Sequence, residues 1–248
     1  MIRKIVYDFL YLGDKILELV IFWFFVLALS IGVYALWDNQ QIYQHADASL
    51  YGEYIPTEKT KTGFEELQER NPDVRGWIQI DNTNISYPVV QGKDNYKYIN
   101  KDAVGKDSLS GSIFMDYRNA SDFSDPNIII YGHHMEKNKM FGELENFKKK
   151  KYFSNHERGA IYYEGSWHQI EIFAFLQADA YDNFIYDINF GSQKTDTKCL
   201  NRIKKKSIYF RKLRWKKEEH FITLSTCMSD CTNGRYVLIG RIAQEESD

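Results

Sequence analysis

The sequence has few cysteines and almost no net charge. Only three of its 248 residues are cysteine, and the formal net charge at pH 7 is −2. An odd number of cysteines does not indicate a disulfide framework, so a free thiol is the simpler interpretation. Near-neutral charge argues against a protein that binds nucleic acid over its whole surface, because neutralising phosphates needs a basic one. We therefore predict no nucleic-acid partner.

Residues that could form a metal site are also few. The zinc-competent candidates are His133, His134, Cys227 and Cys231. Adjacent histidines point to opposite sides of an extended strand, and the Cys-x₃-Cys spacing is not the usual tight zinc pair. We therefore predict no metal site.

One long stretch lacks charge altogether. The nineteen residues over 19–37 carry no charge and lie between Glu18 and Asp38. At about 1.5 Å per helical residue, this run nearly spans a hydrocarbon core of about 30 Å. It predicts a transmembrane anchor. A cleaved signal peptide is the alternative, but the apolar run is long for one.

The basic residues predict the orientation of that helix. Arg3, Lys4 and Lys15 precede the apolar run, whereas the next basic residue after it is Lys59. Since cytoplasmic flanks carry the excess of lysine and arginine, the N-terminus should be cytoplasmic and the bulk of the chain extracellular. We expect a single-pass protein of the cell membrane. Its predicted parts are a cytoplasmic segment over 1–18, the anchor over 19–37, a polar stalk over 38–60 and an extracellular domain over 61–248.

Short strand-like segments dominate the rest of the chain. Helical patterns interrupt them near 62–70, 95–103, 140–149 and 195–206. Many short strands with few crossover helices favour a closed antiparallel barrel over a βαβ sheet, so we predict a mainly β fold. The expected strands cover 77–80, 86–90, 112–115, 128–131, 160–163, 168–177, 221–226 and 236–242.

Two of the apolar runs end in residues with acyl-transfer chemistry. The sequence Thr-Leu-Ser-Thr over 223–226 leads into Cys227, and the run over 128–131 leads through a glycine into His133. Arg235 follows an Asn-Gly turn signal, so a hairpin would return it beside Cys227. A thiol, an imidazole and a guanidinium next to strands are the groups that a cysteine acyl-transfer enzyme needs.

Together these residues resemble the signature of the sortases, most closely class B, over residues 60–243. The resemblance implies a closed eight-stranded sortase-type β-barrel with short peripheral helices. It makes Cys227 the nucleophile that forms a thioacyl intermediate and His133 the acid and base for the amines. It makes Arg235 the group that stabilises the oxyanion or holds the substrate backbone. Ser225 and Thr226, within the motif, would bind substrate.

Other residues of the same types need separate interpretations. The sortase motif places the functional histidine directly after glycine, so His134 is not preferred, and Arg241 lies too far along its strand. We hypothesise that Cys231 forms a reversible disulfide with Cys227. Cys199, in an amphipathic helical pattern, reads as a core residue.

The resemblance also implies an activity and its partners. It describes a membrane-anchored transpeptidase of a Gram-positive cell that needs no organic cofactor. A secreted protein with a C-terminal sorting motif would be cleaved after threonine. An amine of a peptidoglycan precursor would then resolve the thioacyl enzyme and join the protein to the cell wall.

Several alternatives stay open. A secreted cysteine hydrolase would use water as the acceptor, and a non-catalytic anchored barrel would keep Cys227 buried. A pilin-polymerising sortase of another class is the third alternative, because the short spacing from Cys227 to Arg235 departs from the longer class B loops. The segment 197–217 holds ten basic residues and no acidic one. It predicts a solvated helix and loop or, alternatively, a contact zone for anionic envelope components.

Overall fold

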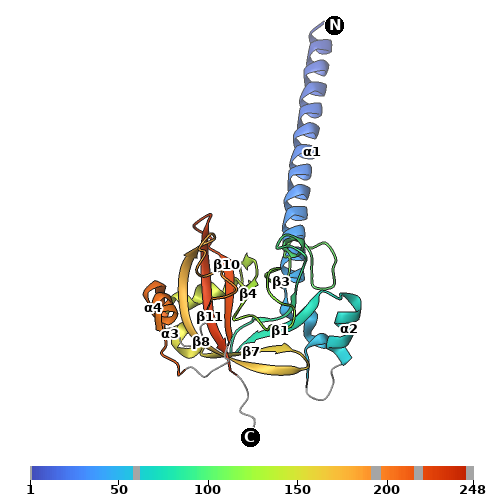
Figure 1. Ribbon diagram of the computed structural model, residues 1–248. Helices are drawn as coiled ribbons and strands as arrows, with labels where there is room; N and C mark the ends of the chain where they lie inside the picture. The colour runs from blue at the N-terminus through green and yellow to red at the C-terminus, as the bar shows by residue number, and fades with distance from the viewer. Residues whose placement is uncertain (1, 58–61, 191–196, 215–219, 244–248) are drawn as a thin grey trace. The chain divides into compact units, whose positions relative to one another are not determined.

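The computed structural model describes residues 2–57, 62–190, 197–214 and 220–243 (Figure 1). The chain divides into two compact units, one up to Gln44 and the other from His45 onward. Each unit is considered by itself.

The first unit is helical. Helix α1 runs over Ile2–His45 and buries none of its side chains in the protein. Its apolar side chains are exposed all round, as expected of a helix that is solvated by lipid rather than packed on one face. By length and composition α1 is a candidate membrane span, and it contains the predicted anchor over 19–37.

The segment expected to be a polar stalk over 38–60 differs from that expectation. Helix α1 continues to His45, and Ala46 is already buried in the core of the second unit. A 3₁₀ helix, η1 (Ala48–Tyr54), follows, and it buries Tyr51 and Tyr54. The hydroxyl of Tyr87 donates to the Ala46 carbonyl at 3.0 Å. The buried residues of this segment, Ala46, Tyr51 and Tyr54, do not recur at a regular period, so no sequence pattern predicted this packing.

The second unit is a closed eight-stranded β-barrel of the predicted kind. Its strands follow the order β11-β10-β4-β3-β2-β1-β7-β8, and pairing of β8 with β11 closes the ring. A further short strand, β9 (Ser207–Phe210), pairs with β8 on the outside of this ring. The barrel strands are β1 (Val74–Ile80), β2 (Ser86–Val90), β3 (Ile113–Met115), β4 (Asn127–Tyr131), β7 (Arg158–Tyr163), β8 (Ser166–Asp179), β10 (His220–Cys227) and β11 (Gly234–Ile242).

The barrel is not antiparallel throughout, as the strand pattern had suggested. Strand β4 pairs with β10 in parallel, and β2 pairs with β3 in parallel. Parallel neighbours need long connections, and the long connection from β4 to β10 contains β5 to β9, α3 and α4. The sequence pattern identifies the strands, but it does not show which distant strand each one pairs with.

Small elements cover the barrel. The helix expected over 95–103 is only a 3₁₀ turn, because the Asp94 side chain accepts bonds from the backbone N–H groups of Tyr96 and Lys97, both at 2.9 Å. The pattern over 140–149 forms a 3₁₀ helix rather than an α-helix. The elements are α2 (Thr62–Arg70), η2 (Lys97–Ile99), β5 (His134–Met135), β6 (Lys139–Met140), η3 (Gly142–Lys148), α3 (Lys150–Asn155) and α4 (Thr197–Lys206).

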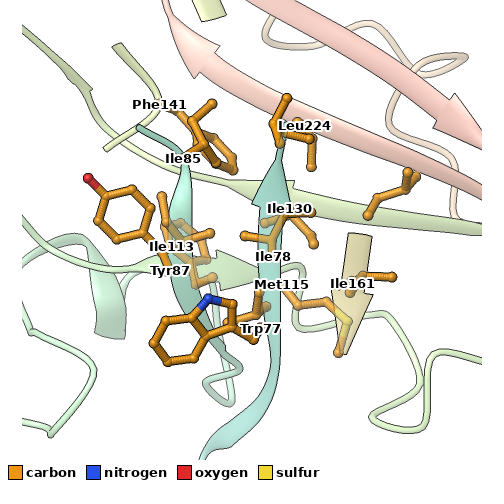
Figure 2. Packing of buried hydrophobic residues seen from close by; sticks show 14 of the residues in the cluster. Trp77, Ile78, Ile85, Tyr87, Ile113, Met115, Ile130, Phe141, Ile161 and Leu224 are labelled. Carbon is orange, nitrogen blue, oxygen red and sulfur yellow. The ribbon is translucent and has the colours of Figure 1, made fainter. Parts of the chain in front are cut away.

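Strand β10 is buried along nearly its whole length because both of its faces are covered. Ile222 and Leu224 point into the barrel core, whose packing around Trp77 and Tyr87 is shown in Figure 2. Phe221 belongs to a second apolar cluster outside the ring, which includes Ile203 of α4. A strand that is covered on both faces has a nearly continuous apolar sequence, and this is the pattern found here.

Candidate active site

Cys227 is the point at which β10 emerges into solvent. The six residues before it, Phe221 to Thr226, are buried, and Cys227 is exposed. The strand is therefore fixed by packing up to its last residue, while the thiol itself stays accessible. A rigid support with an exposed nucleophile is what covalent catalysis requires.

The parallel pairing of β4 with β10 places His133 at the same edge of the barrel. Tyr131 lies opposite Ser225, so His133 and Cys227 each stand two residues beyond a paired position. The N–H of Gly132 donates to the Ser225 carbonyl at 3.2 Å, extending the pairing to the end of both strands. Parallel strands end at a common edge, which brings together two residues far apart in the sequence.

Gly132 is needed for close packing at this edge. A Cβ atom there would lie 2.4 Å from Cδ1 of Ile113 and 2.9 Å from the Phe141 ring. Real Cβ atoms do not approach other atoms this closely, so a side chain would displace the backbone that leads into His133. The glycine before the histidine thus has a steric reason.

His133 is held through both its imidazole and its backbone. Its Nε2 lies 2.8 Å from the Ile99 carbonyl oxygen, which can only accept, so Nε2 carries the hydrogen. The backbone carbonyl of His133 accepts from the Phe141 N–H at 3.0 Å. Nδ1 is therefore the ring nitrogen left to exchange a proton.

Arg235 lies directly across from Cys227 in the β10–β11 pair. Side chains at opposed positions of an antiparallel pair project from the same face, so the guanidinium and the thiol share one side of the sheet. One guanidinium nitrogen, Nη1, donates to the Gly234 carbonyl at 2.9 Å. In the part of the chain that the structure describes, Nε and Nη2 have no such partner, and they can donate to a ligand.

The connection between Cys227 and Arg235 is longer than a two-residue Asn-Gly turn. Met228 N–H donates to the Gly234 carbonyl at 2.9 Å, and Gly234 N–H donates to the Cys231 carbonyl at 3.2 Å. A Cβ atom at Gly234 would lie 2.7 Å from Met228 Sδ and 3.2 Å from Cys231 Sγ. The Cys231 thiol is thus on the Met228 side of the hairpin, whereas Cys227 projects from the other side. All three cysteines are free, and the hypothesised disulfide would require this loop to rearrange.

An open pocket of about 450 Å³ joins these groups. Cys227, His133 and Arg235 all line it, together with Tyr131 and Tyr186. The pocket also takes in Ile99, Phe114, Ala180, Tyr181 and the two motif residues that precede Cys227. Its mixed aromatic and polar lining suits an extended peptide whose reacting carbonyl sits at the thiol.

The two predicted substrate-binding residues line this pocket but are themselves buried. The Ser225 hydroxyl lies 2.9 Å from the Tyr186 hydroxyl, so it supports a pocket wall. Burial raises the pKa of Tyr186 to about 12, which keeps this phenol protonated at neutral pH. The Thr226 hydroxyl is also buried, and among the described residues it has no hydrogen-bond partner.

A buried carboxylate that no sequence pattern predicted contacts residues lining the pocket. Asp116 is fully buried, and its oxygens accept bonds from Arg118 Nε and Nη2 at 2.9 and 2.8 Å. The same carboxylate accepts from the Tyr131 hydroxyl at 2.9 Å and from Asn95 Nδ2 at 3.2 Å. Arg118 Nη2 also donates to the Tyr186 carbonyl at 3.0 Å. One carboxylate therefore connects three segments that line the pocket.

The electrostatics of this carboxylate follow from its partners. Burial alone would raise the pKa of Asp116, but the bonds from Arg118 and Tyr131 outweigh it, and the pKa lies below its usual range. The pKa of Arg118 is raised by the same contact. The pair is ionised at neutral pH. Its residues have ordinary types at unremarkable spacing, so no motif could have revealed it.

His134 and Arg241, the alternatives to His133 and Arg235, each pair with a carboxylate and do not line the pocket. His134 Nε2 is 2.9 Å from the Glu145 carboxylate, and Arg241 sits at the far end of β11 in an ion pair with Glu171 at 2.6 Å. No group of three or more potential metal ligands occurs among the described residues, so the zinc-competent residues do not form a cluster there.

The chain shares its barrel and its pocket-bearing strands with known proteins. The sortase domain family matches residues 78–243. Sortase B of Listeria monocytogenes is 32% identical over 214 residues, covering 82% of this chain and 85% of the relative. Sortase B of Staphylococcus aureus is 32% identical over 189 residues, covering 75% and 76%. The crystal structure of a Streptococcus pyogenes class B sortase involved in pilus biogenesis is 42% identical with a TM-score of 0.67, covering 73% of this chain and 98% of that one. With the family matched from within β1 to the end of β11 and relatives aligned along most of the sequence, this chain belongs to the sortase family and is a cysteine transpeptidase of the class B type.

Proposed function

We propose that this sortase is anchored in the cell membrane by α1 and attaches secreted proteins to a cell-wall amine. The observation that carries the proposal is the register of β10 with its two neighbours. Parallel pairing with β4 brings His133 to the edge where Cys227 emerges, and antiparallel pairing with β11 sets Arg235 opposite Cys227. These three residues are the proposed catalytic groups.

In the proposed first half-reaction, the Cys227 thiol has passed its proton to His133 Nδ1, and the resulting thiolate attacks the carbonyl carbon of the threonine in a sorting motif. The carbonyl π electrons move to oxygen, and the free N–H groups of Arg235 donate to the resulting oxyanion. When the tetrahedral intermediate collapses, the C–N bond breaks and the departing nitrogen takes a proton from His133 Nδ1. The products are a thioester on Cys227 and a free C-terminal peptide.

The second half-reaction runs these steps in reverse with a different amine. The incoming amine of a peptidoglycan precursor attacks the thioester carbon and gives its proton to His133 Nδ1. The C–S bond then breaks, which restores the Cys227 thiolate and leaves a new amide. Proton transfer balances over the full cycle, so no cofactor is required by this route.

The pocket supports the choice of an extended peptide as the first substrate. Its lining includes Tyr131 and Tyr186 as well as Cys227, and its volume of about 450 Å³ leaves room for residues that precede the threonine. We propose that Thr226 contacts the substrate at the thiol and that Ser225 contributes by holding Tyr186, at 2.9 Å. This refines the expectation that both residues touch substrate.

The topology is part of the same proposal. With the cytoplasmic segment over 1–18 and the anchor over 19–37, the catalytic domain would face the outside of the cell, where sorting motifs and cell-wall amines occur. The candidate span within α1 and the excess of basic residues before it support this placement.

A pilin-polymerising activity is the second candidate function. It is favoured by one observation, the 42% identity to a Streptococcus pyogenes class B sortase involved in pilus biogenesis. In that case the acceptor amine would come from a protein lysine rather than from a peptidoglycan precursor. The donor half-reaction at Cys227 would be the same.

Mass spectrometry of the full chain in detergent micelles tests these proposals. The enzyme is incubated with a panel of sorting-motif peptides, alone, with triglycine, or with a lysine-containing pilin peptide. We expect a Cys227 adduct, cleavage after threonine, and ligation to an amine. Cys227→Ala should abolish all three, whereas the matched control Cys231→Ala, with its thiol on the other side of the hairpin, should retain them.

The acceptor identifies the function. Preference for triglycine supports cell-wall attachment, and preference for the pilin peptide supports polymerisation. Cleavage with water as the sole acceptor would show a hydrolase. An active Cys227→Ala variant would refute the assignment of the nucleophile.

A further inference from the structure

We propose that α3 and the α4–β9 segment form one basic face that binds anionic phospholipid headgroups. This surface does not include the catalytic groups, so the proposal is independent of the proposed reaction. The basic face consists of exposed cationic side chains from two parts of the chain. They are Lys149, Lys150 and Lys151 at the start of α3, and Lys204, Lys205, Lys212 and Arg214 in and after α4.

Strand β9 brings the two parts together. The Tyr209 hydroxyl donates to the carbonyl of Lys148 at 3.1 Å, directly before α3. The Tyr209 ring also stacks on Phe153 of α3, with centroids 5.5 Å apart. The Arg211 guanidinium also lies over the Phe153 ring, 4.1 Å from its centroid. Helix α4 itself packs on β8 and β9 (Figure 1). Two lysine runs that are separate in the sequence thus become one surface.

The packing of α4 directs its lysines outward. Ile203 is fully buried in the outer apolar cluster, and Leu200 and Cys199 pack against the same cluster. With this face of the helix buried, Lys204 and Lys205 are left on the exposed side. The expectation that Cys199 belongs to the core side of this helix agrees with this arrangement.

Few of the cations near the basic face are neutralised. Lys206 pairs with Asp182 at 2.6 Å, and Arg211 pairs with Glu157 at 3.3 Å. In the described ranges, none of the seven side chains that define the face has an acidic partner within 4.0 Å. Unpaired charges of one sign produce a local positive potential, although the whole chain has a net charge of −2.

A phospholipid surface fits this face better than a single bound anion. Lysines carry compact, hydrated point charges on flexible stems, whereas bidentate grip of one phosphate favours arginine. The charges are spread over two elements, as suits a surface of many headgroups. Ile208 of β9, 44% exposed, lies in the same segment and can enter the interface between headgroups and acyl chains.

The candidate span of the same chain strengthens this choice. A domain tethered to a bilayer meets its headgroups at a high effective concentration, so even weak electrostatic contacts become occupied. The basic face would then restrict how the tethered domain can turn relative to the bilayer.

The test measures vesicle binding of a fragment covering residues 45–248, because a fragment without the span binds only through its surface. This unit has its own core, and α1 buries no side chain. The Streptococcus pyogenes structure, matched over 98% of its length, covers only 73% of this chain, so a related domain folds without the remaining 27%. Flotation is measured with vesicles of phosphatidylcholine alone and with added phosphatidylglycerol, at low and high salt. We expect binding to the anionic vesicles at low salt and release at high salt.

Paired substitutions show whether the two lysine runs act as one face. K150Q/K151Q in α3 and K204Q/K205Q in α4 should each weaken binding about 25-fold, since a lysine near an anionic membrane contributes about five-fold. The matched control K93Q/K106Q removes the same charge from exposed lysines outside the face and should leave binding unchanged. Thermal melting of each variant confirms that it is folded.

Three results would overturn the proposal. One is equal binding to vesicles with and without phosphatidylglycerol, and another is an equal loss in the control variant, which would indicate only a net-charge effect. The third is binding to neutral vesicles that carry a prenyl pyrophosphate together with none to phosphatidylglycerol, which would show a site for the pyrophosphate instead.

Discussion

The two ends of the β10–β11 strand pair contain similar residues in opposite states. At one end, His220 Nδ1 donates to the Asp125 carbonyl at 2.6 Å, and Arg241 pairs with the Glu171 carboxylate. At the other end, Cys227 is exposed and the Arg235 guanidinium bonds mainly to its own neighbouring backbone. Folded proteins satisfy nearly all of their buried polar groups. The end at which polar groups keep free bonding capacity is therefore the end available to a ligand.

The largest expected effect separates the two arginines. Arg235→Ala should lower kcat/KM for peptide ligation by about 10²–10³-fold, as loss of an oxyanion donor does, because in the proposed reaction its free N–H groups donate to the oxyanion. Its effect on unfolding should be small, since its side chain makes no ion pair among the described residues. Steady-state kinetics and thermal unfolding of the same preparations measure both quantities.

Arg241→Ala is the matched control at the other end of the strand. Its pair with Glu171 is mostly buried on the arginine side, so removal should cost about 1–3 kcal/mol of unfolding free energy. Ligation below the melting temperature should be preserved. If Arg241→Ala lost activity as strongly as Arg235→Ala without unfolding, the contrast between the two ends would be wrong.

The next effect concerns the carboxylate that holds the pocket. Asp116→Asn keeps the shape of the side chain but removes the charge that five donor atoms contact, and it should cost about 2–3 kcal/mol of stability. Loosening the pocket wall should raise KM for the peptide while leaving the alkylation rate of Cys227 unchanged. An equal fall in alkylation would mean that Asp116 acts on the thiol and not on the pocket.

The same variant should change how the stability of the fold depends on pH. The folded pKa of Asp116 lies below the ordinary value of 3.8, so its ionised form stabilises the fold. That contribution is complete above 3.8 and is lost as pH falls below 3.8 through the lower folded value. Chemical denaturation from pH 6 down to about 2 should therefore show a smaller acid-induced loss of stability in Asp116→Asn than in the native protein.

The catalytic candidates could be predicted from the sequence, whereas most of the buried contacts that hold them in place could not. The motif around Cys227, the strand ends and the strand carrying Arg235 were all predicted from local pattern, because apolar runs and turn residues act over a few positions. The parallel pairing of β4 with β10, the Asp116 contacts and the packing of Ala46 depend on residues far apart in the sequence. No local pattern encodes such partners, and the short strand β9 offers too few residues for a period.

A smaller effect is expected at Gly132. Gly132→Ala would place a methyl group 2.4 Å from Ile113 and 2.9 Å from the Phe141 ring, and overpacking of this kind costs about 1–3 kcal/mol. Displacement of the following residue should lower kcat, with KM less affected, because in the proposed reaction His133 transfers protons rather than binding the peptide. Ile113→Val supplied together with Gly132→Ala creates room at the nearer contact. Partial recovery in the double variant is expected, and no recovery would place the strain elsewhere.

The smallest effect tests whether Ser225 acts through Tyr186. Their hydroxyls lie 2.9 Å apart in a buried position, so Tyr186→Phe and Ser225→Ala should each cost about 0.5–1.5 kcal/mol, with the remaining hydroxyl left unsatisfied. Removing both partners should cost less than the sum of the two changes, because neither hydroxyl is then stranded. Urea denaturation of the four proteins in this cycle gives the coupling free energy, and peptide KM measured on the same set reports the pocket wall. A coupling in stability that is matched by a coupling in KM means that Ser225 shapes the pocket by positioning the phenol. Additive effects in both quantities would instead mean that the two residues act separately, and the contrast between exposed catalytic groups and buried supports would not extend to Ser225.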